Sequence, residues 1–274
     1  MTVTPPVALT VAGSDSGGGA GLQADLRTFT ACGVHGCVAV TAVTVQNSRA
    51  VTGIVEIPPS TVADQIRAVV SDIGIGAAKT GMLASAGIIS AVTKMCDEVG
   101  LGTSVPLVVD PVAASMHGDP LLTADALDGV RSELFPHATL VTPNLDEVRL
   151  LIGLDVQSRA QQYDAARALH ALGPQWVLVK GGHLHDDPEC VDLLYDGSDV
   201  IEFTAPRVAT PHTHGGGDTL AAAITSALAR GADMPTAVRY GKHYVSQAVA
   251  HAYPLGTGVG PVSPFWRLRP ADPC

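Results

Sequence analysis

The chain has 274 residues and a mass of 28.0 kDa, and its 46% hydrophobic and 15% charged residues exclude a disordered polypeptide. Sixteen basic and twenty-six acidic residues give a net charge of −10, which disfavours nucleic-acid binding because phosphates attract lysine and arginine. No apolar run approaches the roughly 20 residues that span a bilayer, and the first residues lack a basic leader. Five cysteines form no CxxC pair. We therefore expect a cytoplasmic protein with reduced thiols and neither a nucleic-acid nor a membrane partner.

Valine-rich segments alternate with alanine-rich amphipathic segments along the chain. The pattern predicts strands at residues 6–13, 38–45, 54–57, 77–80, 107–110, 140–141, 176–180, 191–195 and 200–203. It predicts helices at residues 21–30, 58–72, 85–99, 123–134, 159–172, 217–230 and 234–251, with a further helix after Asn144. Such alternation is typical of an α/β fold with a mostly parallel sheet. Because no linker or repeat divides the sequence, we predict one domain over residues 1–274.

Ligands of such sheets bind beyond the carboxyl ends of the strands, so the residues that follow each strand are the candidates for a site. Residues 19–24 match the dinucleotide fingerprint G-x-G-x-x-A between a strand and a helix. That fingerprint requires an acidic residue about 20 positions later, and none lies between Asp25 and Glu56. The P-loop pattern is absent. The sequence therefore argues against a Rossmann dehydrogenase and a P-loop nucleotidase.

A Gly-Gly-Gly-Asp segment at residues 215–218 leads directly into an alanine-rich helix. Backbone N–H groups at a helix N-terminus bind anions, and glycines leave them unobstructed. A carboxylate in the first turn, Asp218, can accept a proton from a substrate hydroxyl, which suits phosphoryl transfer. The alternative is a glycine turn in which Asp218 merely complements the helix dipole.

Three more polar positions follow predicted strands. Asp110 ends one apolar strand, Asn144 and Glu147 follow another, and Lys180 precedes two glycines. Mg²⁺ prefers one or two carboxylates together with water and phosphate oxygens, so Asp110 and Glu147 are candidate ligands and Lys180 is a candidate phosphate contact. Alternatively, Asn144 and Glu147 form a capping box, and Lys180 is a solvated lysine at a strand end.

Together these segments resemble the hydroxymethylpyrimidine/phosphomethylpyrimidine kinases of thiamine biosynthesis, a family of the ribokinase-like superfamily. The matching segments lie in the family's order and cover almost the whole chain, at residues 8–25, 41–47, 79–84, 109–112, 115–122, 142–147, 179–183, 213–220 and 258–261. The resemblance implies a three-layer α/β/α sandwich. It also implies transfer of the ATP γ-phosphoryl group to the hydroxymethyl group of an aminopyrimidine, then of a second phosphoryl group to the monophosphate. Relatives often pair as homodimers.

The resemblance also implies a role for each matching position. Catalysis falls to Asp218 as the base and to Gly215, Gly216 and Gly217 as the anion hole. The substrate pocket is lined by Gln46, Asp25, Gly13, Ala20, Met82 and Val112. The ATP side is formed by Lys180, Asn144 and Thr210, and Mg²⁺ is held by Asp110 and Glu147.

This chain departs from the family pattern at the anion hole, where Gly-Gly-Gly-Asp replaces the usual Gly-Thr-Gly-Cys. A carboxylate is ionised at neutral pH in model peptides whereas a thiol is not, so we expect the chemistry to survive. Residues 210–212, Thr-Pro-His, also differ from the usual Thr-Lys-Asn, which affects contacts on the ATP side. These departures leave open pyridoxal or pyridoxine as the substrate. A non-catalytic binder of pyrimidines is a third hypothesis, which the retained charged residues disfavour.

Two H-x-H pairs occur, at His183 with His185 and at His212 with His214. Zinc binding is conceivable from such pairs, but alternating histidines alone indicate it only weakly. We favour loop histidines that lie near phosphates.

Overall fold

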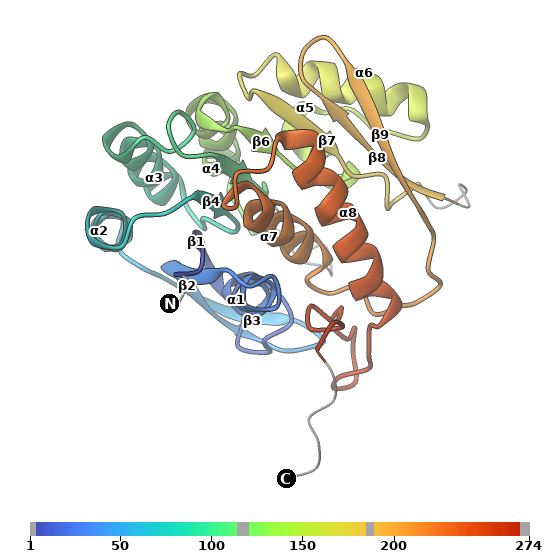
Figure 1. Cartoon of the computed structure of the whole chain (residues 1–274), viewed down its shortest axis with the longest axis horizontal. Coiled ribbons are helices and arrows are strands. Elements are labelled where there is room, and N and C mark those ends of the chain that lie inside the picture. The colour runs from blue at the N-terminus through green and yellow to red at the C-terminus, as the bar shows by residue number, and fades with distance from the viewer. Residues whose placement is uncertain (1–3, 114–120, 185–188, 269–274) are drawn as a thin grey trace.

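Short apolar strands form the centre of a mixed nine-stranded sheet in the computed structural model, which describes residues 4–113, 121–184 and 189–268 (Figure 1). Six adjacent strands are parallel: β2 (His35–Gln46), β1 (Val7–Ser14), β4 (Ala77–Thr80), β5 (Leu107–Val109), β6 (Leu140–Val141) and β7 (Trp176–Val179). One edge is antiparallel β3 (Val51–Glu56), and the other is the hairpin of β8 (Glu189–Tyr195) and β9 (Val200–Pro206).

Helices cover both faces of the sheet, because alternate strand residues point to opposite sides and most are apolar. Ala77 and Val108 pack with one layer, formed by α1 (Gly21–Ala31), α7 (Gly216–Leu228) and α8 (Met234–Ala250). Ala78 and Val109 pack with the other, formed by α2 (Pro59–Asp72), α3 (Ala86–Val99), α4 (Ala124–Gly129), α5 (Leu145–Ile152) and α6 (Arg159–His170). The three-layer α/β/α sandwich expected from the sequence is therefore confirmed.

The structure shifts several predicted boundaries. β2 begins at His35 rather than Val38, because His35 pairs with Val7 of β1 across the sheet. The helix predicted over residues 123–134 is shorter than expected. α4 ends at Gly129, and the chain continues through a π-helical turn, Val130–Leu134, into a 3₁₀ turn, Phe135–His137. None of the helices within the described ranges is long and apolar enough to cross a membrane.

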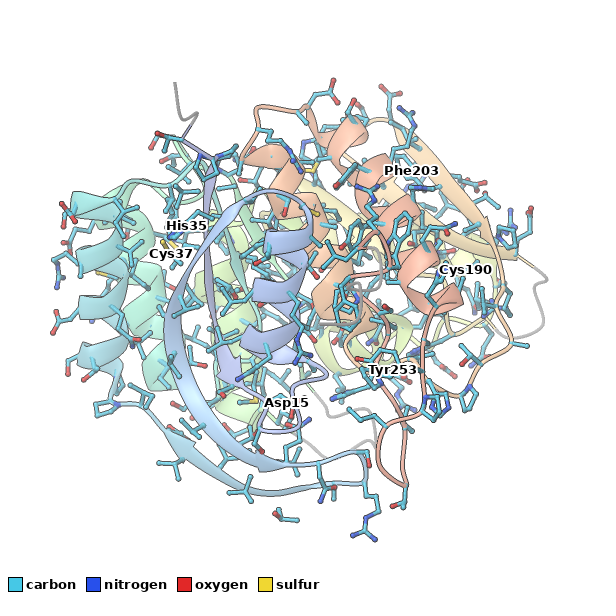
Figure 2. All side chains as sticks on the ribbon, turned by 60° about the horizontal axis from the view of Figure 1, so that its bottom comes forward. Asp15, His35, Cys37, Cys190, Phe203 and Tyr253 are labelled. Carbon is cyan, nitrogen blue, oxygen red and sulfur yellow. The ribbon has the colours of Figure 1, made fainter. Side chains whose placement is uncertain are left out.

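The fold brings the candidate residues together. The parallel strands β1, β4, β5, β6 and β7 all end at one edge of the sheet, and α7 begins beside that edge. The long β2 and its partner β3 extend past this edge and carry Gln46 at the end of β2 (Figure 2). The site is therefore built from segments that are distant in sequence but share one end of the sheet.

Candidate active site

The N-terminus of α7 begins at a glycine, Gly215, that no other residue could replace without strain. Gly215, the N-cap, has φ 75° and ψ 11°, the left-handed region that side chains disfavour. The N–H of Gly216 donates to the carbonyl of Thr213 at 3.1 Å. The N–H groups of Gly217 and Asp218, in the first helical turn, have no partner in the preceding turn of the helix. The predicted three-glycine anion hole is therefore modified, since the N–H of Gly216 is already engaged.

A buried carboxylate joins this turn to the glycine-rich loop that follows β1. Asp15 accepts hydrogen bonds from the N–H groups of Gly17 at 2.8 Å and of Gly19 and Ala20 at 2.9 Å (Figure 2). The Nε2 atom of His214 lies 3.0 Å from Asp15 Oδ2. Burial raises the pKa of Asp15, but His214 and the backbone N–H groups outweigh burial and hold that pKa below its usual value. The Asp15–His214 contact therefore fixes one loop against the other.

Lys180 joins two carboxylates at the edge of the sheet where the parallel strands end. Its Nζ atom donates to Asp110 Oδ1 at 3.0 Å and lies 3.8 Å from Glu147 Oε2. The hydroxyl of Thr142 also donates to Asp110 Oδ1, at 3.0 Å. A Cβ atom on Gly217 would lie 3.3 Å from both Lys180 Nζ and Asp110 Oδ2. Lys180, the predicted phosphate contact, and Asp110, a predicted Mg²⁺ ligand, thus form an ion pair next to the N-terminus of α7.

The structure confirms the capping-box interpretation of the Asn144–Glu147 segment. The two residues form a capping box at the start of α5, with Glu147 N–H donating to Asn144 Oδ1 at 2.8 Å and Asn144 N–H to Glu147 Oε2 at 2.7 Å. The same Glu147 carboxylate faces Lys180. Burial raises the pKa of Glu147 to about 7, although Lys180 opposes the shift. Asn144 therefore positions Glu147 as well as the helix.

Asp25 lies beneath the site, contrary to the prediction that it lines the substrate pocket. Its side chain is completely buried: Oδ1 accepts a bond from Lys79 Nζ at 2.7 Å, and Oδ2 accepts one from the Thr10 hydroxyl at 2.6 Å. Burial raises the pKa of Asp25 to about 7, against the effect of Lys79. Lys79 also lies 3.6 Å from Asp218 Oδ1. Asp25 thus supports Lys79 rather than a ligand.

The remaining pocket positions surround the ends of β1, β2 and β4. Gly13 lies against Met82, whose Cε atom would be 2.6 Å from a Cβ at position 13. Thr41 fixes this segment by donating its hydroxyl to the Met82 carbonyl at 2.7 Å. Gln46 is held by Ser16, which donates to its carbonyl at 2.7 Å and accepts from its N–H at 2.8 Å. Met82 and Gln46 are both partly exposed at this edge.

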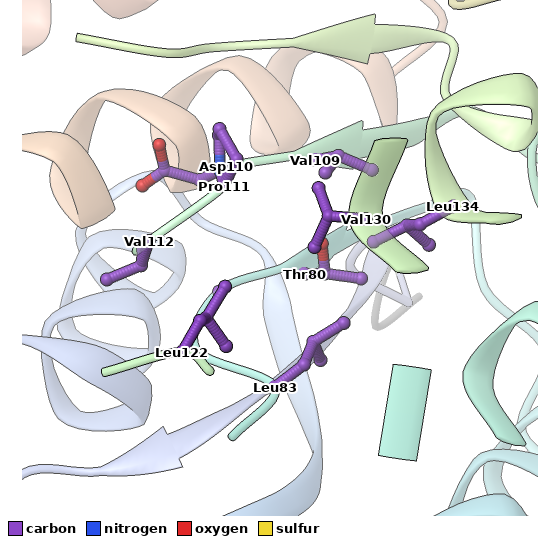
Figure 3. Close-up of a pocket in the computed structure, with 10 residues that line it drawn as sticks. Thr80, Leu83, Val109, Asp110, Pro111, Val112, Leu122, Val130 and Leu134 are labelled. Carbon is purple, nitrogen blue, oxygen red and sulfur yellow. The ribbon is translucent and has the colours of Figure 1, made fainter. Parts of the chain in front are cut away.

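Val112 is partly exposed beside Asp110, at the rim of a small apolar hollow (Figure 3). Leu83 and Leu122 line the same hollow. Ala20 is the N-cap residue of α1, at the end of the loop that Asp15 holds. Val112 and Ala20 therefore both stand at the edge of the sheet where the predicted substrate residues gather.

The hydroxyl of Thr210 forms a hydrogen bond within its own turn and does not contact Lys180. Its hydroxyl accepts a bond from the N–H of His212 at 3.1 Å, and His212 Nδ1 accepts one from Gly260 N–H at 3.0 Å. His212 and His214 are therefore each tied to protein groups. The described residues contain no group of three or more His, Cys, Asp or Glu side chains placed to hold a metal ion. His185 and most of the 115–122 segment lie outside the described residues.

Sequence reasoning assigned no role to Lys79, Thr142 or Asp15, all of which contact candidate site residues. A signal existed for Lys79, because a lysine in a short apolar strand requires a buried counter-charge. Asp15 and His214 are 199 residues apart in the chain, and no local pattern connects them.

Replacing Gly215 by alanine tests the fit between the two loops. A methyl group there would overlap the Gly19 carbonyl oxygen and adopt a left-handed conformation, so we expect a clear fall in the thermal midpoint of unfolding. The matched control is Gly216→Ala, since a Cβ there would lie 3.9 Å from Val262 Cγ1 and the backbone is helical. Calorimetry that found equal midpoints for the two variants would contradict this account.

The chain is similar to known proteins over nearly its whole length. The family model described as phosphomethylpyrimidine kinase matches residues 15–263. A hydroxymethylpyrimidine/phosphomethylpyrimidine kinase of Mycobacterium leprae (strain TN) is 61% identical over 268 residues, which are 96% of this chain and 95% of that protein. An ADP complex of Bacillus subtilis pyridoxal kinase superposes with a TM-score of 0.90 at 36% identity, covering 97% of this chain and 100% of the other.

The phosphomethylpyrimidine kinase from Clostridium difficile 630 superposes with a TM-score of 0.78, also at 36% identity, covering 89% of this chain and 99% of that chain. The family match spans most of the sequence, and the relatives align over nearly their whole lengths. This chain belongs to the phosphomethylpyrimidine kinase family.

Proposed function

We propose that this protein is an ATP-dependent kinase that phosphorylates the hydroxymethyl group of 4-amino-5-hydroxymethyl-2-methylpyrimidine and then the monophosphate, giving the diphosphate for thiamine biosynthesis. One observation carries the proposal. The first turn of α7, with Asp218, adjoins the Lys180–Asp110 ion pair, so a base, anion-binding N–H groups and a phosphate-binding cation meet at one point. These are the parts that phosphoryl transfer requires.

In the proposed reaction the acceptor hydroxyl attacks the γ-phosphorus of ATP while Asp218 accepts the hydroxyl proton. The N–H groups of Gly217 and Asp218, aided by the helix dipole, bind the oxygens of the phosphoryl group in transit. Lys180 binds a nucleotide phosphate and offsets the negative charge that develops on the leaving ADP. An aspartate needs no prior deprotonation at neutral pH, so it can replace the cysteine usual at this position.

The residues also suit Mg²⁺. This ion takes one or two carboxylates and completes its shell with water and phosphate oxygens, and Asp110 and Glu147 supply two buried carboxylates beside Lys180. When bound, Mg²⁺ neutralises phosphate charge and helps to align the nucleotide. Asn144 orients Glu147 through the capping box, and Thr142 orients Asp110 through its hydroxyl.

The substrate side follows the same edge of the sheet. The side-chain amide of Gln46 has both a donor and an acceptor, which matches the edge of an aminopyrimidine. Met82 packs on the ring over Gly13, where the lack of a side chain leaves room for the Met82 methyl group. Ala20 and Val112 close the sides of the pocket. Thr210, on the loop before α7, remains a candidate contact for ATP.

A second candidate substrate is pyridoxal, because a pyridoxal kinase superposes on this chain with a TM-score of 0.90. Pyridoxal is also a flat heteroaromatic ring with a hydroxymethyl arm. One domain over residues 1–274, a homodimeric assembly and a cytoplasmic location remain predictions beside this function.

A coupled ATP-consumption assay with Mg²⁺ tests the proposal directly. The purified protein is compared on hydroxymethylpyrimidine, its monophosphate and pyridoxal at equal concentrations. We expect preferred turnover of both pyrimidines. Preference for pyridoxal would show that the change at residues 215–218 accompanies a change of substrate, and turnover of none of the three would favour the non-catalytic binder.

Asp218→Asn keeps the shape of the side chain but removes the base. We expect kcat to fall by ~10²–10⁴-fold, with little change in KM for ATP, because a general base acts in the transition state. Asp233→Asn is the matched control, since Asp233 caps α8 and asparagine caps equally well. Near-normal turnover by Asp218→Asn would exclude Asp218 as the base.

Gln46→Ala tests the substrate pocket. We expect titration calorimetry to show weaker pyrimidine binding and nearly unchanged ATP binding, because the change removes hydrogen bonds to the ring only. Gln65→Ala is the control: Gln65 also contacts β2, accepting from Val40 N–H at 3.0 Å, but on the helix α2. Equal weakening of both ligands by Gln46→Ala would remove Gln46 from the pocket.

A further inference from the structure

Lys79 is a charged residue at the centre of the molecule that the reaction, as described so far, does not use. It stands in β4, between β1 and β5, and its side chain is completely buried. Burying an ammonium group is unfavourable unless carboxylates compensate it, and an apolar residue would fill the same place without that cost. Packing alone therefore does not explain a lysine at this position.

The ammonium group of Lys79 faces two carboxylates that lie in different surroundings. Asp25, at 2.7 Å, is completely buried, and its other oxygen is held by Thr10. Asp218, at 3.6 Å through Oδ1, keeps 14% of its side chain exposed at the site. Asp25 therefore anchors Lys79 on the buried side. Of the three residues, Asp218 alone has a partly exposed side chain that a substrate can contact.

The backbone at Gly81 passes close to Lys79 and Asp218. A Cβ atom on Gly81 would lie 3.6 Å from Lys79 Nζ, 3.9 Å from Asp218 Oδ1 and 3.1 Å from Ala12 Cβ. Glycine at this position lets the segment after β4 cover the ammonium and the carboxylate. Thr10, Asp25, Lys79 and Asp218 thus form a continuous series of polar contacts from β1 through α1 and β4 to α7.

We propose that Lys79 is a positioning residue for phosphoryl transfer: its ammonium holds Oδ1 of Asp218 and leaves the other carboxylate oxygen free for the acceptor hydroxyl. This inference rests on the proposed role of Asp218 as the base. The ammonium also offsets the negative charge of the carboxylates around it, Asp25 and Asp218. The carboxylates that interact with Lys79 or Asp218 are Asp25 on α1, Asp110 after β5 and Glu147 on α5, and Lys180 after β7 pairs with the last two.

Lys79→Met removes the charge while it keeps most of the apolar volume. We expect kcat to fall on the order of 10²-fold, because a misplaced catalytic group costs about that much, while KM for ATP and for the pyrimidine changes little. A carboxylate that loses a neighbouring cation binds a proton more readily, so the acidic limb of the kcat profile moves to higher pH. Lys79→Arg restores part of kcat.

A double-mutant cycle separates positioning from mere support of the fold. If Lys79 acts through Asp218, Lys79→Met lowers kcat strongly in the wild type but hardly at all in the Asp218→Asn background. Thr225→Val is the structural control, since Thr225 is buried in α7 and its hydroxyl donates only to the Ala221 carbonyl of the same helix, at 2.8 Å. We expect Thr225→Val to keep the wild-type kcat and pH profile.

If Lys79→Met does not fold, the comparison is made between Asp25→Asn and the double variant Asp25→Asn with Lys79→Met, which leaves no uncompensated charge between the two residues. An unchanged kcat and pH profile on loss of Lys79, or an equal loss in the Asp218→Asn background, would overturn the inference. The proposed function itself would be contradicted by a different result, namely that the wild-type protein turns over none of the three substrates.

Discussion

The close approach of the α7 N-terminus to the carboxyl edge of the sheet is the constraint on which the site depends. Only glycine allows it: Gly215 adopts a left-handed conformation against the Gly19 carbonyl, and Gly217 leaves room for Lys180 and Asp110. The helix therefore directs its positive end at the place where the parallel strands end. The Asp15–His214 contact holds the same arrangement from the other loop.

The charge balance of the site follows from this geometry. The buried Lys79 and the partly exposed Lys180 face four carboxylates, Asp25, Asp110, Glu147 and Asp218. The excess of negative charge is unfavourable in a protein interior, and burial accordingly raises the pKa of both Asp25 and Glu147 to about 7. A cation held by Asp110 and Glu147, as proposed for Mg²⁺, would offset this excess.

Local sequence patterns predicted those strands and site residues whose structure depends on residues nearby in the chain. The short buried strand β4 was predicted to the residue, because four apolar or buried positions stand between clear breaks. Asp110 and Lys180 were found because each follows an apolar strand. The start of β2 at His35 was missed, since it depends on pairing with Val7 rather than on its own composition.

A long-range ion pair between a helix and a strand explains why Asp25 was misplaced. Its family match suggested a pocket residue, but its partner Lys79 lies 54 positions away and on another element. The sequence shows both charged residues of such a pair, but it does not show that they are in contact.

The lysine beneath position 218 offsets the charge that an aspartate brings there. A thiol is neutral until it is activated, whereas a carboxylate brings a full charge into a site that already contains several others. Such a base needs a fixed cation that neither competes for the substrate nor leaves with the product. A lysine anchored by a second, wholly buried carboxylate meets that condition, because Asp25 and Thr10 hold it from the side away from solvent. The chemistry at the surface of the site thus depends on an ion pair that no ligand ever contacts.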